Sequence, residues 1–179
     1  MLLGVALLAR GRADGLQYFR GTAQAFMASL APLIAFPLVG VVLLLMGRGD
    51  TGGFTDLLAA TCGLLAPAVV SEWLARRWGR EAEWPRYAVA FNWCQWAVPV
   101  AAAALLLVLS AFMAAGLPNV VAGNAVLLGL SGYALWLHWF LARHGLSLGA
   151  GRAALFVLLV DLGTGVCVTV PALLADMLQ

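Results

Sequence analysis

Five polar side chains lie in otherwise apolar stretches, where they could bind a ligand or carry a proton. They are Glu72, Asn92, Gln95, His138 and Asp161. Ionisable groups are costly at membrane depth, so each is expected to have a buried partner or a function. Asp161 stands out, because the nearest preceding charge, Arg152, is nine residues away. Its carboxyl group could accept hydrogen bonds from Asn92, Gln95 or His138, or remain protonated.

Helical spacing places small and polar residues on one face of the segment around Asp161. This face holds Asp161, Thr164, Gly165, Val168 and Ala172, as expected where one membrane helix packs on another. Asn92 and Gln95 lie one turn apart, and Asn124, Ser131 and His138 recur every seven residues. Three interpretations remain open for the polar residues. They could form a packing network, a ligand or ion site, or a contact with a partner subunit.

Two of the five polar residues also have simpler interpretations. Glu72 precedes Arg76 by four residues, which favours an ion pair at a helix end. His138 lies between Trp136 and Trp139, which is typical of an imidazole near the membrane surface. No second histidine or carboxylate has ligand spacing near His138, so no metal site is predicted.

The composition indicates that lipid surrounds these residues. Hydrophobic residues make up 64% of the 179 residues and charged residues 10%, against roughly 45–50% and 25% in soluble domains. A soluble fold could not bury so much apolar surface. The net charge is only +2, so no nucleic-acid partner is expected.

Five stretches are long enough to cross a bilayer, which takes roughly 20 mainly apolar residues. They span about residues 26–46, 54–74, 87–115, 120–142 and 153–178. Residues 1–25 contain an apolar run too short to cross, and we expect them to lie on the membrane surface as an amphipathic segment. The sequence therefore predicts an all-α polytopic membrane protein, with residues 26–178 as one five-helix domain.

The arginines predict the orientation of the chain. With five spans and the N-terminus inside, only Arg48 falls on the outer side. The inner segments hold Arg10, Arg12, Arg20, Arg76, Arg77, Arg80, Arg86, Arg143 and Arg152. Basic residues of short loops stay in the cytoplasm. We therefore expect a bacterial inner-membrane protein with a cytoplasmic N-terminus and a periplasmic C-terminus.

Common catalytic and cofactor motifs are missing from the sequence. It contains no phosphate-binding GxxxxGK[ST] loop and no GxSxG, HExxH, CxxC or CxxCH motif. Cys62, Cys94 and Cys167 lie far apart in apolar runs and are interpreted as packing residues. We therefore predict no cofactor and no catalytic residue.

Three sequence blocks resemble small bacterial members of the Yip (Ypt-interacting protein) family. They are RGRADGLQYFRGT, FNWCQW at Phe91–Trp96, and FVLLVDLGTG. The likeness extends to the five spans, the inside N-terminus and the short N-terminal amphipathic segment. It implies a fold more than a task, because eukaryotic relatives bind Rab-type GTPases in a trafficking pathway that bacteria lack. The long N-terminal extension of those relatives is also missing here.

These observations favour a non-enzymatic scaffold or accessory subunit of a membrane complex. Its partners would be the lipid bilayer and, through helix contacts, other subunits or further copies of the chain. The alternative is a small transporter or proton-linked permease in which Asp161 titrates. A third hypothesis, an intramembrane enzyme, requires Asp161 and His138 within hydrogen-bond reach.

Overall fold

The described architecture is entirely helical. The computed structural model describes residues 1–43, 46 and 51–177. Within these residues there is no β-strand, and five helical segments are long and apolar enough to cross a membrane. The prediction of an all-α polytopic membrane protein is therefore confirmed. Arg48, the one arginine expected on the outer side, lies outside the described residues.

Two short helices precede the long ones. They are α1 (Leu2–Leu8) and the 3-10 helix η1 (Ala13–Tyr18). The long helices are α2 (Ala23–Leu43), α3 (Thr51–Arg77), α4 (Trp84–Cys94), α5 (Ala97–Ala114), α6 (Asn119–Gly145) and α7 (Ala150–Met177). All five predicted stretches overlap these helices. At 27 residues, α3 is about 40 Å long, more than the ~30 Å of a hydrocarbon core.

The third predicted span, residues 87–115, is not one continuous helix. Its α-helical hydrogen bonding is interrupted at residues 95–96, between α4 and α5, where the backbone dihedral angles stay helical. Pro99 explains the break, because proline lacks an N–H and its ring clashes with the carbonyl group four residues earlier, here that of Gln95. The two helices still follow one another along one path, and Trp84–Ala114 remains a single candidate membrane crossing.

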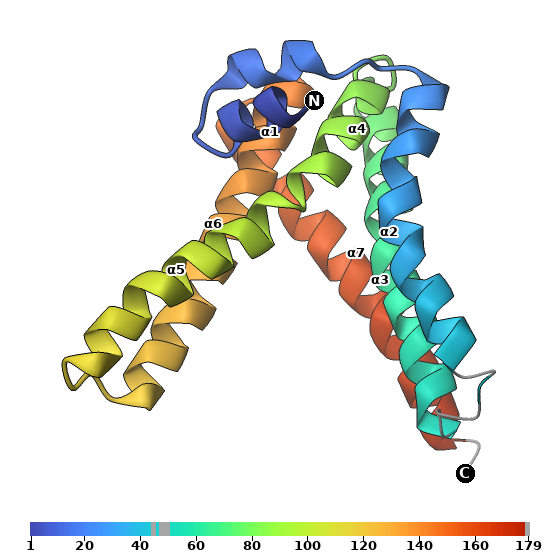
Figure 1. The fold of residues 1–179 in the computed structure, drawn as a ribbon. Helices are drawn as coiled ribbons and strands as arrows, with labels where there is room; N and C mark the ends of the chain where they lie inside the picture. The colour runs from blue at the N-terminus through green and yellow to red at the C-terminus, as the bar shows by residue number, and fades with distance from the viewer. Residues whose placement is uncertain (44–45, 47–50, 178–179) are drawn as a thin grey trace.

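The long helices form two arms that diverge from a shared end (Figure 1). One arm contains α2, α3 and α7, and the other is the hairpin of α5 and α6. At the shared end, which we call the apex, α4 links the arms, and α1 and η1 lie across the top. The end of α7 lies at the opposite end of the molecule from α1.

The buried core lies at the apex. The largest fully buried side chains are Tyr87, Phe156, Leu8, Leu141, Leu146, Val89, Val160 and Cys94. Away from the apex, large apolar side chains are exposed on both arms, among them Leu107 at 75% and Leu162 at 58%. Such a surface suits contact with lipid tails, because the helices satisfy their own backbone hydrogen bonds.

The N-terminal segment is packed onto the apex. Its helix α1 has seven residues and is therefore too short to cross a bilayer. A Cβ atom on Gly15 would lie 2.7 Å from the carbonyl oxygen of Gly4, so η1 approaches α1 as closely as a glycine allows. The hydroxyl group of Tyr133 in α6 donates a hydrogen bond to the carbonyl oxygen of Ala9 at 3.2 Å. The Tyr133 hydrogen bond ties the segment to α6.

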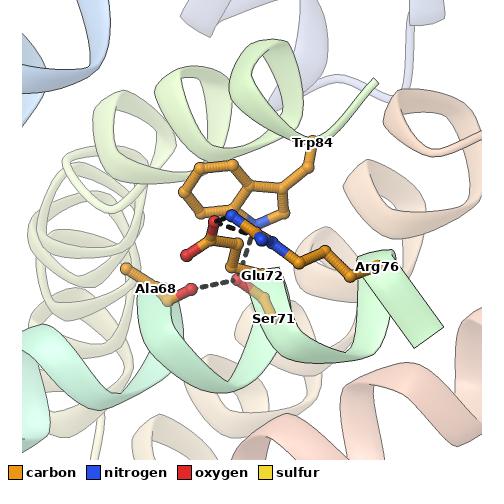
Figure 2. Close-up of polar contacts among 5 residues, drawn as sticks. All are labelled: Ala68, Ser71, Glu72, Arg76 and Trp84. Carbon is orange, nitrogen blue, oxygen red and sulfur yellow. Dashed lines mark hydrogen bonds and ion pairs between the residues drawn. The ribbon is translucent and has the colours of Figure 1, made fainter. Parts of the chain in front are cut away.

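Trp84 joins the start of α4 to α3 (Figure 2). Its indole N–H donates a hydrogen bond to Ser71 Oγ at 3.0 Å. The Ser71 hydroxyl in turn donates to the carbonyl oxygen of Ala68 at 3.1 Å. Both polar groups of the pair are thereby satisfied in a region where unpaired polar atoms are costly.

The described arginines gather at the apex. They lie in the α1–η1 link, before α2, at the end of α3, around the start of α4, at the end of α6 and at the start of α7. Each of these segments is at the apex in Figure 1. The structure thus places nine arginines at one end of the molecule.

Candidate functional site

His138 and Asp161 are in contact across the interface of α6 and α7. His138 Nδ1 lies 3.3 Å from Asp161 Oδ1. The side chain of His138 is 8% exposed and that of Asp161 is 45% exposed. Among the described residues no arginine pairs with Asp161. His138 is its ion-pair partner, and the imidazole carries a charge only when it is protonated.

Tyr87 of α4 contacts the other nitrogen of the same imidazole. Its hydroxyl oxygen lies 2.9 Å from His138 Nε2. The Tyr87 ring is 1% exposed and packs edge-on against Phe156 and stacked on Phe91. Phe91 also contacts the imidazole, with 4.7 Å between ring centroids. Three helices therefore hold His138 in one orientation.

Among the described residues, the only side-chain hydrogen bond to the imidazole of His138 comes from Tyr87. Tyr87 Oη lies 2.9 Å from Nε2, and the imidazole tautomer sets which of the two groups donates. Nδ1 lies at ion-pair distance from the Asp161 carboxylate, 3.3 Å.

The pair lines a cavity of about 470 Å³ between the two arms. Cavities of this size are typical of small-molecule sites. Most of the wall is apolar, with Pro67, Val98, Leu137 and Val168 among its residues. Polar groups come from His138, Asp161, Gln95, Thr164 and Thr169. A ligand here would meet an apolar surface with polar groups gathered around Asp161.

Thr164 adds an unusual group to the cavity wall. Its hydroxyl oxygen is buried and has no hydrogen-bond partner among the described residues. It lies three residues beyond Asp161 on α7, so the two side chains share a helical face. A buried hydroxyl group without a partner costs free energy. A polar ligand group beside Asp161 would therefore be stabilised by Thr164 as well.

The five residues singled out from the sequence do not form one cluster. Gln95 lines the cavity with His138 and Asp161. Asn92 points elsewhere: its amide donates to Ser29 Oγ at 2.9 Å, and both side chains are buried between α2 and α4. This contact is a packing link between helices. Asn92 is therefore not a donor to Asp161.

Glu72 also lies outside the cavity wall. Its carboxylate accepts hydrogen bonds from Arg76 at 2.6 and 3.1 Å, in the ion pair that the spacing predicts (Figure 2). The Arg76 side chain is largely exposed. The pair belongs to the exposed end of α3, so Glu72 is not a partner of Asp161.

The sequence analysis did not single out Tyr87. One signal was present, because Tyr87, Phe91 and Gln95 follow one another at intervals of four residues and share a helical face. The described residues contain no group of three metal-ligating side chains. The site therefore consists of a phenol hydrogen-bonded to an imidazole, with a carboxyl group at ion-pair distance from the same ring, beside an apolar cavity.

The arrangement differs from that of a hydrolytic triad. In such a triad the imidazole nitrogen remote from the carboxylate activates a nucleophile that faces the substrate. Here that nitrogen contacts Tyr87, which is buried and is not part of the cavity wall. The distance that the enzyme hypothesis requires is present, but the group beyond the imidazole faces away from any ligand.

Comparison with known proteins gives no matching family model, no matching curated protein and no matching solved structure.

Proposed function

We propose that this protein is a small proton-linked permease in which His138 and Asp161 form the proton site. The observation that carries the proposal is the 3.3 Å contact between these residues at the wall of the 470 Å³ cavity. A carboxyl–imidazole pair beside a cavity is suited to coupling, because binding one proton changes its net charge by one unit. In a low-dielectric site that change alters the affinity for a charged or polar ligand.

The cavity limits the class of substrate. Its mainly apolar wall suits a small molecule with an apolar body, and the polar groups near Asp161 suit a single hydrogen-bonding or basic group. Tyr87 contacts no ligand in this proposal. It acts as a positioning residue, because its hydroxyl fixes which imidazole nitrogen faces Asp161.

The break at residues 95–96 supplies a point where α5 can move relative to α4. Gln95 lies at this break and also at the cavity wall. Bending there would move the hairpin of α5 and α6 relative to the arm that contains α7, and so change the width of the cavity between them.

Proteoliposomes with an imposed pH gradient test the proposal. The probes are small amphipathic amines and alcohols, whose uptake is measured with and without the gradient. Asp161→Asn should abolish gradient-driven uptake while the melting temperature in detergent stays close to that of the parent. Glu72→Gln is the matched control, because it also converts a carboxylate to an amide and should retain uptake. A variant with Asn at position 161 that transports normally would remove the basis of the proposal.

We propose as a second function a scaffold or accessory subunit that works through helix contacts. Support comes from α6, where Asn124 and Ser131 are exposed on an otherwise apolar arm. The Asn124 amide has no partner among the described residues, and such a group facing lipid is costly. A partner helix would satisfy it. Purification of the tagged protein in mild detergent tests this function: a strictly monomeric particle without partners argues against it, and a complex that Asn124→Leu disrupts supports it.

We also propose that the protein belongs in the bacterial inner membrane, with the apex on the cytoplasmic side. The arginines at the apex support this orientation through the preference of basic residues for the cytoplasm. Labelling of single cysteines placed at each terminus in intact cells tests it, because the two ends should react in different compartments.

Membership of the Yip family remains a proposal. Support comes from two of the blocks that carry the resemblance, FNWCQW and FVLLVDLGTG. Each block contributes residues to the cavity wall, including Phe91, Gln95 and Asp161. A shared cavity in a solved structure of such a family member would support the relationship.

A further inference from the structure

A second recess lies at the apex, apart from the cavity between the arms. Its volume is about 260 Å³, and it is mainly polar. Three segments that are distant in sequence form it: η1 with the link to α2, the start of α4, and the end of α6 with the link to α7. Its polar side chains are Glu83, Arg86, His144 and Ser147.

Close backbone packing holds the walls of this recess together. A Cβ atom on Gly21 would lie 3.2 Å from the backbone nitrogen of Arg86, so the link before α2 lies directly against α4. A Cβ atom on Gly145 would lie 3.2 Å from the Cβ atom of Tyr87, so the end of α6 also lies against α4. The recess is therefore part of the packed apex.

The charge left over in the recess is positive. The carboxylate of Glu83 is paired with Arg80 at 3.3 Å, so its charge is offset. Arg86 is exposed and has no carboxylate partner among the described residues. His144 is exposed as well, with its ring 4.5 Å from that of Phe140 between centroids. An arginine and an imidazole thus face the same small space.

Ser147 presents a hydroxyl group to the recess from a strained backbone. Its φ is 51°, a left-handed conformation that is uncommon for residues other than glycine. It is the only non-glycine residue with positive φ in the described part of the chain. Strain of this kind clusters at sites that bind ligands, and here it falls on a residue of the recess wall.

The surroundings of the recess strengthen the preference for an anion. The apex segments contain nine arginines and four carboxylates, Asp14, Glu72, Glu81 and Glu83. The recess also lies at the ends of two candidate membrane crossings, Trp84–Ala114 and Asn119–Gly145. The ends of such crossings are expected near the lipid headgroups, which carry the phosphates.

We infer that this recess binds a phosphate group, with Arg86 as the charged donor and His144 and Ser147 as further donors. The placement at the membrane surface favours the headgroup of an anionic lipid as the source. Arginine matches phosphate oxygens in geometry and charge. This site is independent of the proposed transport function, because it shares no residue with the cavity between the arms.

The test uses the full chain in detergent micelles and measures its melting temperature. The probes are dihexanoyl phosphatidylglycerol and inorganic phosphate, each compared with sodium chloride of equal ionic strength. Phosphatidylglycerol should raise the melting temperature of the parent. The half-maximal concentration should increase at least about tenfold in Arg86→Gln, as expected for loss of a charged hydrogen bond.

Arg77→Gln is the matched control. Arg77 is exposed at the same end of the molecule and is not part of the recess wall. This variant removes the same charge and should respond like the parent. Ser147→Gly provides a second variant that relieves backbone strain, so it should fold. It should nevertheless bind phosphatidylglycerol more weakly than the parent does.

The outcomes separate the sources of the phosphate. Protection that depends on Arg86 and occurs with phosphatidylglycerol alone assigns the site to lipid. The same dependence with inorganic phosphate supports phosphate recognition and assigns it to a soluble ligand. Two results would overturn the inference: no protection by either probe, or equal loss in the Arg86→Gln and Arg77→Gln variants.

Discussion

Tyr87 and Asp161 contact opposite ring nitrogens of the same histidine. Tyr87 Oη is 2.9 Å from His138 Nε2, and Asp161 Oδ1 is 3.3 Å from His138 Nδ1. Within this series of contacts, Tyr87 is buried and Asp161 borders the cavity. A change at the buried phenol should therefore reach the carboxylate through the orientation of the imidazole.

Tyr87→Phe tests this relationship. The substitution leaves His138 Nε2 buried without a partner, and we expect a loss of about 1–3 kcal/mol in stability. If the protein transports, uptake should fall and its pH profile should shift, because the imidazole can then turn away from Asp161. Melting temperature and the pH dependence of uptake are the measurements. His138→Leu should make the Tyr87→Phe change nearly silent in a double-mutant cycle. Additive effects would show that the two residues are not coupled.

Asn92→Ala should weaken the packing of α2 on α4. It removes the hydrogen bond to Ser29 Oγ, and such bonds between membrane helices contribute on the order of 0.6 kcal/mol. Uptake should stay normal, because Asn92 does not line the cavity. Gln95→Ala is the converse variant: stability should change little, whereas ligand binding in the cavity should change. A large loss of uptake in the Asn92→Ala variant would show that Asn92 does belong to the functional site.

Gly15→Ala should displace the N-terminal segment from the apex. Its new Cβ atom would lie 2.7 Å from the carbonyl oxygen of Gly4, which is backbone and cannot turn aside. Overpacking of this kind costs about 1–3 kcal/mol. Limited proteolysis between α1 and η1 should become faster. Gly151→Ala is the control, since nothing lies within 4 Å of its added Cβ atom and alanine favours the helix. Equal proteolysis in both variants would contradict the close packing of α1 on η1.

Pro99→Ala should make the crossing formed by α4 and α5 more continuous. The substitution restores an N–H that can bond to the carbonyl of Gln95 and removes the ring that clashes with it. Spin labels on α5 and α7 should report a narrower distribution of distances between the arms. Uptake should fall if bending at residues 95–96 is part of transport. An unchanged distribution would show that another feature causes the break.

The sequence predicts the positions of the helices better than it predicts which helices pack together. Long apolar runs predict all five crossings, because a helix must satisfy its own backbone in lipid. The break at residues 95–96 was missed, although Pro99 was visible, because prolines are tolerated within many membrane helices. Asp161 and His138 stand out in the sequence because ionisable groups are costly within a membrane. Their contact depends on which helices pack together. Helical spacing predicts the face on which a residue lies, but it does not predict which helix packs against that face.

The same limit explains the other site residues. The sequence places Asn92 one turn from Gln95, yet its partner is Ser29 of α2. In the sequence Tyr87 is one of several aromatic residues near helix ends, which are common at the membrane surface. Its role becomes visible only when α4, α6 and α7 meet at the apex.

The divergence of the two arms has a mechanical consequence. The buried core lies at the apex, whereas α5 packs mainly against α6. A force on the far end of the hairpin of α5 and α6 would therefore turn it about the apex. Any such rotation would change the width of the cavity beside Asp161.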